Sequence, residues 1–242
     1  MTDLPTNPYQ APLADLNARP MPTGQSGSIE DAVAGRYDFD IGDVMREAWW
    51  LTRGMKGSFW AAAALIYAVL FVAMFIGAAI AGKSPVLGVV MNFVVGLAAP
   101  ALFIGLVAMG IRRAAGLPVS FATAFSCFDR TVTALLAGFL TTILTYLGIF
   151  LLIIPGMYLA IAYCMTMFLI ADRNLGAWQA METSRQAVTK RWFKFFGLLL
   201  LVGLLVGASA LPLGIPLIWT IPWAINVLGV VYRRTFGVAQ TV

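Results

Sequence analysis

The stretch IIPGMYLAIAYCMTMFLIADRNLGAW, residues 153–178, places a Pro-Gly pair between two apolar runs. In a soluble protein this pair marks a surface turn among polar neighbours. Here Ile, Leu, Phe and Met stand on both sides, and the first charged residue downstream is Asp172. Pro155 suits the start of a helix because its ring fixes φ, and Gly156 lets another backbone come close. The stretch therefore predicts a tight turn between two helices at a membrane face.

The composition of the whole chain agrees with this interpretation. Of the 242 residues, 60% are hydrophobic and 11% are charged. A soluble domain carries about 25% charged residues, because water must wet its surface. So few charges indicate an integral membrane protein.

Six apolar runs are predicted to form transmembrane helices, since about 20 helical residues cross a bilayer core of roughly 30 Å. None of the runs contains Asp, Glu, Lys or Arg. The fourth is short, so the third and fourth also have a second interpretation as one re-entrant pair. The six runs are residues 58–81, 86–111, 132–153, 157–171, 195–211 and 214–232.

The basic residues predict the orientation of these runs. Of the 16 Lys and Arg residues, only Lys83 falls in a turn on one side, and the remaining 15 fall on the other. Because Lys and Arg are retained in the cytoplasm, both termini are predicted to be cytoplasmic. The net charge of +5 follows from this distribution, so nucleic acid is not an expected partner.

The chain is predicted to be all-α, with a disordered tail over residues 1–36 that is rich in Pro, Gly, Asn and Ser. A six-helix membrane domain follows over 37–236, and a short tail over 237–242. An amphipathic cytoplasmic helix is expected before the first, third and fifth runs, with Asp38 or Asp40, and then Ser120, as candidate N-caps. The domain therefore divides into three units, residues 38–111, 119–171 and 175–232.

Two sets of residues are candidates for contact rather than chemistry. Gly203 and Gly207 form a GxxxG pair, which predicts close helix packing inside the bundle or, as a second interpretation, across a homodimer. Clustered basic residues at the cytoplasmic face are candidate contacts for anionic lipid headgroups. These are Arg112, Arg113, Lys190, Arg191, Lys194, Arg233 and Arg234.

The residues needed for catalysis are scarce. There is no histidine, and the two cysteines, Cys127 and Cys164, have the character of small apolar side chains. No phosphate-binding loop, metal-ligand cluster or nucleophile–base pair is recognisable. The sequence therefore predicts no enzyme, no catalytic residue, no cofactor and no metal site.

The segments IPGMYLA (154–160), LGAWQAMETS (175–184) and KRWFKFFGLLL (190–200), with Asp172 between the first two, resemble a broad bacterial and archaeal membrane family. It includes the membrane domain of some glycerophosphodiester phosphodiesterases and the YciC-type uncharacterised membrane proteins. NPYQAP at 7–12 resembles a tail motif of such proteins. The resemblance implies a six-helix protein of the bacterial inner membrane and implies no catalysis, since the phosphodiesterase activity belongs to a separate soluble barrel.

These observations lead to two hypotheses about function. The first is a non-catalytic scaffold or accessory protein that acts through its cytoplasmic helices on other membrane or cytoplasmic proteins. The alternative is a transporter or lipid-handling protein for a neutral or amphiphilic molecule. Membrane lipids are expected partners in both, and the sequence leaves the oligomeric state open.

Overall fold

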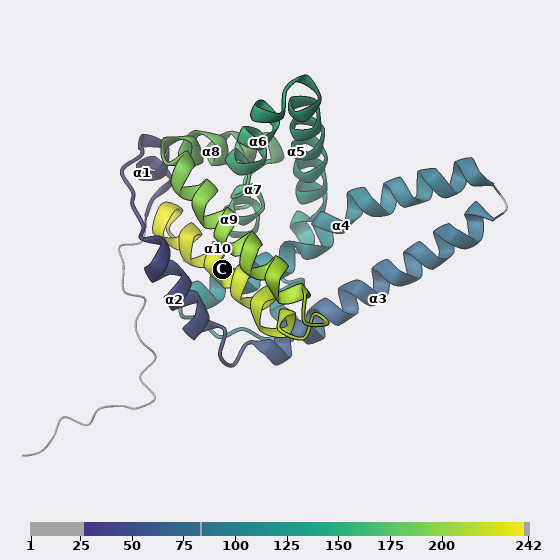
Figure 1. Ribbon diagram of the computed structural model, residues 1–242, viewed down its shortest axis with the longest axis horizontal. Coiled ribbons are helices and arrows are strands. Elements are labelled where there is room, and N and C mark those ends of the chain that lie inside the picture. Colours follow the sequence, from purple (N-terminus) through teal and green to yellow (C-terminus); the bar gives the residue numbers. More distant parts are fainter. Residues whose placement is uncertain (1–26, 83, 240–242) are drawn as a thin grey trace, which may run out of the picture.

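The computed structural model describes residues 27–82 and 84–239, apart from the side chains of 97–101 (Figure 1). In these residues every regular element is a helix, and none is a strand. The elements are α1 (Ile29–Ala34), α2 (Ile41–Leu51), α3 (Lys56–Ala81), α4 (Pro85–Ala114), the 3₁₀ turns η1 (Phe121–Phe125) and η2 (Phe128–Arg130), α5 (Thr131–Leu151), α6 (Ile153–Ala162), α7 (Thr166–Arg173), α8 (Ala177–Lys190), α9 (Trp192–Ala210) and α10 (Leu217–Phe236).

Three helical hairpins, α3–α4, α5–α6 and α9–α10, organise the chain. The tips of the hairpins carry exposed apolar side chains, such as Ile153 in α5–α6 and Leu211 after α9. In α3, Phe59 near the start of the helix is buried, whereas Phe71 and Phe75, farther along it, are 71% and 69% exposed. The α3–α4 hairpin extends farthest from the rest of the molecule (Figure 1).

Among the residues that the structure describes, four helical segments are long and apolar enough to cross a membrane, by length and composition. They are Lys56–Ala81, Phe121–Leu151, Ile153–Arg173 and Trp192–Ala210. Within α4, the part whose side chains are described includes a shorter apolar stretch, Pro85–Gly96. These helices indicate a multi-pass membrane protein. The sequence-based count of six also includes the runs 86–111 and 214–232, which cover most of α4 and α10. As a whole, α10 is less apolar because it contains Pro222, Asn226 and two arginines.

The turn between the third and fourth runs differs in detail from the expectation. The chain reverses at Leu152, whose φ and ψ of −161° and 140° are extended, and Pro155 lies in the first turn of α6. A Cβ atom added to Gly156 would lie 2.4 Å from the backbone nitrogen of Ile149. A Cβ atom added to Gly148 would likewise lie 2.9 Å from the Cα of Gly156. The absence of two side chains therefore lets α5 and α6 pack with their backbones in contact.

The fourth run, 157–171, is not one continuous helix. α6 ends at Ala162 and α7 begins at Thr166, so the chain bends in the middle of the run. Ser184 of α8 accepts a hydrogen bond from the backbone nitrogen of Met165, at 3.2 Å, and donates one to the carbonyl of Ala162, at 2.7 Å. Both of these backbone groups sit at the bend, so the serine stabilises it.

The N-terminal tail is shorter than the sequence suggests. Ser28 caps α1 by accepting a hydrogen bond from the backbone nitrogen of Asp31, and Ala32 of α1 is fully buried. Residues 27–36 of the tail expected over 1–36 are therefore folded. Tyr37, which follows them, anchors this segment by donating to the carbonyl of Ala187 at 2.8 Å. The expectations for residues 1–26, including NPYQAP, for Lys83 and for 240–242 lie outside the described residues.

The segments expected to be amphipathic helices differ from one another. α2 begins at its N-cap Asp40, and α8 is a regular helix. The middle segment forms only the 3₁₀ turns η1 and η2, although Ser120 and Thr123 do form a capping box. In α8, Trp178 is 66% exposed, whereas Ala180, Met181 and Ser184 lie on the buried face.

The closest crossing between distant helices is made by glycines other than those singled out. Gly203 and Gly207 have nothing within 4 Å of an added Cβ, so they do not pack inside this chain. Gly110 of α4 and Gly229 of α10 instead face each other, and a Cβ added to Gly229 would lie 2.5 Å from the carbonyl oxygen of Gly110. Small residues at such crossings let helices approach closely in membranes.

Gly229→Val is therefore expected to destabilise the fold by about 1–3 kcal/mol or more, because overpacking forces α4 and α10 apart. Gly203→Val is the matched control, since it makes the same substitution within a helix where space is open. Unfolding in detergent micelles measures both. Equal stability of the two variants would show that the crossing of α4 and α10 is not tight.

Candidate functional site

Four arginines bind the C-terminal ends of four helices and so define the polar centre of the molecule. Arg113 of α4 donates from Nε to the carbonyl of Leu51, the last residue of α2, at 2.7 Å. Arg233 of α10 donates to the carbonyl of Ala114, the last residue of α4. We call Arg113, Arg130, Arg173 and Arg233 the cap arginines.

The other two cap arginines extend the same arrangement. Arg173 of α7 donates to the carbonyl of Phe236, the last residue of α10, at 3.1 Å. Arg130 of η2 donates to the carbonyl of Ala171 near the end of α7. The contacts therefore form a series in which α4 caps α2, α10 caps α4, α7 caps α10, and η2 caps α7.

The chemistry of helix ends explains why arginine occupies these positions. The last four carbonyls of an α-helix have no partner within the helix, and the end carries a partial negative charge. A cation there typically contributes 0.3–1 kcal/mol, and up to about 2 kcal/mol where it is partly buried. A guanidinium also has several donors, so one side chain can bind a carbonyl and a carboxylate together.

Glu47 of α2 supplies a negative charge within this cluster. Its carboxylate accepts one hydrogen bond from Arg233 and one from Arg234, each at 2.8 Å. The Arg233 side chain is only 5% exposed, and that of Glu47 only 18%. A buried pair of this kind positions its partners, and removing one of them leaves a charge without compensation.

Asp172 supplies the second carboxylate, and its side chain is fully buried. It accepts hydrogen bonds from the Tyr232 hydroxyl at 2.7 Å and from Arg173 Nε at 3.0 Å. The backbone nitrogen of Ala239 donates to both carboxylate oxygens, at 3.1 Å each. Asp172 therefore ties the end of α7 to α10 and to the segment that follows it.

The candidate lipid-binding residues separate into two groups. Arg113, Arg233 and Arg234 are engaged with backbone carbonyls or with Glu47, so their charged ends point into the protein. Lys190, Arg191 and Lys194 lie at the surface, where α8 meets α9. Arg112, on α4 beside Arg113, is partly buried. We call Lys190, Arg191 and Lys194 the surface basic group.

Asp38 pairs with this surface group and links the segment before α2 to α9. It accepts from Lys194, and its carboxylate lies 3.8 Å from Arg191. The hydrogen bond from Lys194, followed by smaller effects of Phe39 and Arg191, lowers the pKa of Asp38 below its ordinary value. The pair attaches residues 37–39 to the start of α9.

Glu47 and Asp172, which hold the helix ends together, were not identified as a site from the sequence. Asp172 was noted only as a boundary and as part of a family resemblance. The signal in the sequence was that each carboxylate lies next to an apolar run and has arginines close to it along the chain. No sequence pattern specifies that Glu47 meets residues 186 and 187 positions away.

Within the described residues, no group of three or more Cys, Asp or Glu side chains could hold a metal ion. The carboxylates and guanidiniums of the cluster are paired with each other or with helix ends, so the arrangement can fix helix positions. No protein-family model, curated protein or solved structure matches this chain.

Arg233→Met is expected to destabilise the protein by about 3 kcal/mol, because it removes the cap of α4 and one partner of a buried pair. Arg46→Met on α2 is the control, since Arg46 is 82% exposed and its change is expected to cost less than about 0.5 kcal/mol. Chemical unfolding in detergent micelles gives both values. A difference within error between them would mean that Arg233 contributes no more than a surface charge.

The Asp38 pair is expected to make stability depend on pH in the acid range. Because its pKa is lowered in the folded state, the stabilisation is present above the unfolded value of about 3.9 and is lost as pH falls through the folded-state pKa. Wild type and Asp38→Asn should therefore differ at pH 7, by less than about 1 kcal/mol for an exposed pair, and this difference should shrink as pH falls below the unfolded value of about 3.9. A difference in stability that stays constant as pH falls would contradict this assignment.

Proposed function

We propose that this chain is a multi-pass protein of the bacterial inner membrane with both termini in the cytoplasm, and that it acts as a non-catalytic scaffold. In this proposal the α3–α4 and α9–α10 hairpins cross the bilayer. The third and fourth of the six runs expected from the sequence correspond to α5 and to α6–α7. The resemblance to the YciC-type family is part of the proposal.

The orientation is supported by where the charges lie. The cap arginines, Glu47 and Asp172 gather the C-terminal ends of α4, α7 and α10 with α2. The ends of α4 and α10 are bases of the α3–α4 and α9–α10 hairpins, and the hairpin tips carry apolar, exposed side chains. Basic residues are retained on the cytoplasmic side, so the bases are proposed to face the cytoplasm.

The scaffold role rests mainly on large aromatic side chains exposed beside the charged bases. Trp178 of α8 is 66% exposed and Trp49 of α2 is 50% exposed, although each helix buries another face. Tryptophan is enriched both at membrane interfaces and at the centres of protein interfaces. Two such side chains on the cytoplasmic elements therefore support binding to a protein at the membrane surface.

Lipid handling or transport is the second candidate, and the bend between α6 and α7 favours it. Discontinuous helices often line binding sites in transporters. Here, however, the freed backbone groups at Ala162 and Met165 are bound by Ser184. A hollow between α3, α4 and the 3₁₀ turns holds only about 30 Å³, which suits a water molecule and not a lipid.

Site-specific cross-linking tests the scaffold role. A photo-reactive residue replacing Trp178 or Trp49 is expected to give the same discrete protein adduct in cells at native expression. The control replaces Phe71, which is at least as exposed but lies in the apolar middle of α3, and is expected to yield only lipid adducts. The scaffold proposal fails if positions 178 and 49 give no protein adduct in several growth states.

A further inference from the structure

We propose that the α5–α6 hairpin enters only the cytoplasmic leaflet and turns within it, so that its tip at Leu152 contacts acyl chains of that leaflet without reaching the far side. This inference rests on the proposed membrane orientation and changes the six-span count that came from the sequence. It makes the third and fourth runs a re-entrant pair.

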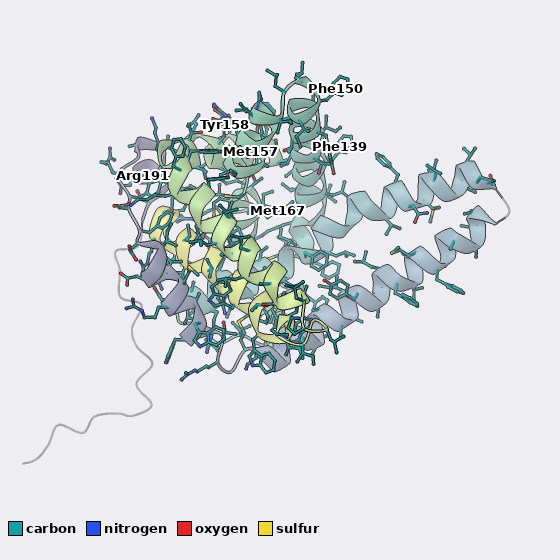
Figure 2. The ribbon with its side chains drawn as sticks, in the orientation of Figure 1. Phe139, Phe150, Met157, Tyr158, Met167 and Arg191 are labelled. Carbon is teal, nitrogen blue, oxygen red and sulfur yellow. The ribbon has the colours of Figure 1, made fainter. Side chains whose placement is uncertain are left out.

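The first observation is the level at which α6 meets polar groups. The Tyr158 hydroxyl lies 2.7 Å from Thr189 Oγ1, and the indole nitrogen of Trp192 donates to the Tyr158 carbonyl at 3.4 Å. Thr189 and Trp192 flank Lys190 and Arg191, so Tyr158 lies at the level of the surface basic group. Figure 2 labels Tyr158, Met157 and Arg191 in the same upper part of the molecule as Phe150 at the tip of α5.

The second observation is the length of the tip beyond this level. Leu152 precedes Tyr158 by six residues, which is about 9 Å of helix. A bilayer core is roughly 30 Å thick. If Lys190 and Arg191 lie at the headgroups, the turn at Leu152 therefore remains within the first leaflet.

The third observation is that α8 runs beside α6 and α7. Ser184, in the middle of α8, binds the bend between them, and Thr189 near its end meets Tyr158. If α6–α7 crossed the bilayer, α8 would lie in the core beside it, and α8 carries Glu182, Arg185 and Lys190. Each charged side chain costs at least about 2.5 kcal/mol at the bilayer centre.

The tip itself has the properties needed to lie among acyl chains. Phe150 is 88% exposed, and Leu152, Ile153 and Ile154 are each 68–75% exposed, with no charged residue among them. At the turn, Leu152 donates to the carbonyl of Gly148 at 3.0 Å, and its own carbonyl accepts from Gly156 at 3.5 Å. An apolar tip above Lys190, Arg191 and Trp192 matches a leaflet whose headgroups are anionic.

The exposed face of α5 also supports contact with acyl chains. Val132, Leu136, Ile143 and Leu147 are exposed along one side of α5, below Phe150. α5 is longer than α6, with 21 residues against 10. A helix of this length that stays in one leaflet lies obliquely, with its apolar side toward the acyl chains.

Labelling with a membrane-impermeant maleimide tests the proposal in the full chain carrying Cys127→Ala and Cys164→Ala. Ala160→Cys is the main reporter, because Ala160 is exposed and lies just past Tyr158 on α6. It is expected to label in inside-out vesicles as completely as Thr189→Cys, and not in right-side-out vesicles. Leu152→Cys is expected to label from neither side, and Ser84→Cys only from the far side.

Two outcomes would overturn the re-entrant hairpin. Labelling of Leu152→Cys from the far side would show that the turn emerges there. Protection of position 160 from the cytoplasmic side would show that α6 lies deep in the bilayer, and Tyr163→Cys, at the partly exposed residue that follows α6, checks this should Ala160→Cys fail to fold. If Ser84→Cys labels from the cytoplasmic side instead, the proposed membrane orientation itself is wrong.

Discussion

The unpaired carbonyls at helix C-termini are the constraint on which the rest of this structure depends. Several apolar helices end close together, and each end leaves carbonyl oxygens that need donors. The cap arginines supply these donors from neighbouring helices, so that α2, α4, α7 and α10 are each held by a residue of another element. The position of one helix end thus determines where the next can lie.

The same constraint gathers charged side chains where helix ends meet. Arginines concentrated at these ends require carboxylates, and Glu47 and Asp172 provide them in buried positions. The hairpin tips in turn carry apolar side chains such as Leu211 and Phe150. A bilayer tolerates such tips, whereas water would favour burying them against each other.

Close backbone contacts add a second level of organisation above the arginine contacts. Gly110 and Gly229 set the crossing of α4 and α10, and Gly148 and Gly156 set the approach of α5 and α6. The bend between α6 and α7 lets the lower part of the fourth run turn into the protein core, where Leu169 and Ile170 are fully buried. Burial by protein rather than lipid is the reason that hydropathy alone gives no reliable depth for this segment.

The sequence by itself determined the features that depend on local chemistry. Apolar runs gave helices, Asp40 capped α2 as one of two candidates, and the low charge content indicated a membrane protein. Only the tertiary structure decided which glycines pack, since Gly203–Gly207 and Gly110–Gly229 look alike as small residues in apolar helices. It also decided that 121–130 forms 3₁₀ turns and that Arg233 meets Glu47 and Ala114, 186 and 119 positions away. The physical reason is that a cap or a close crossing requires a partner from a distant part of the chain, and no local pattern identifies that partner.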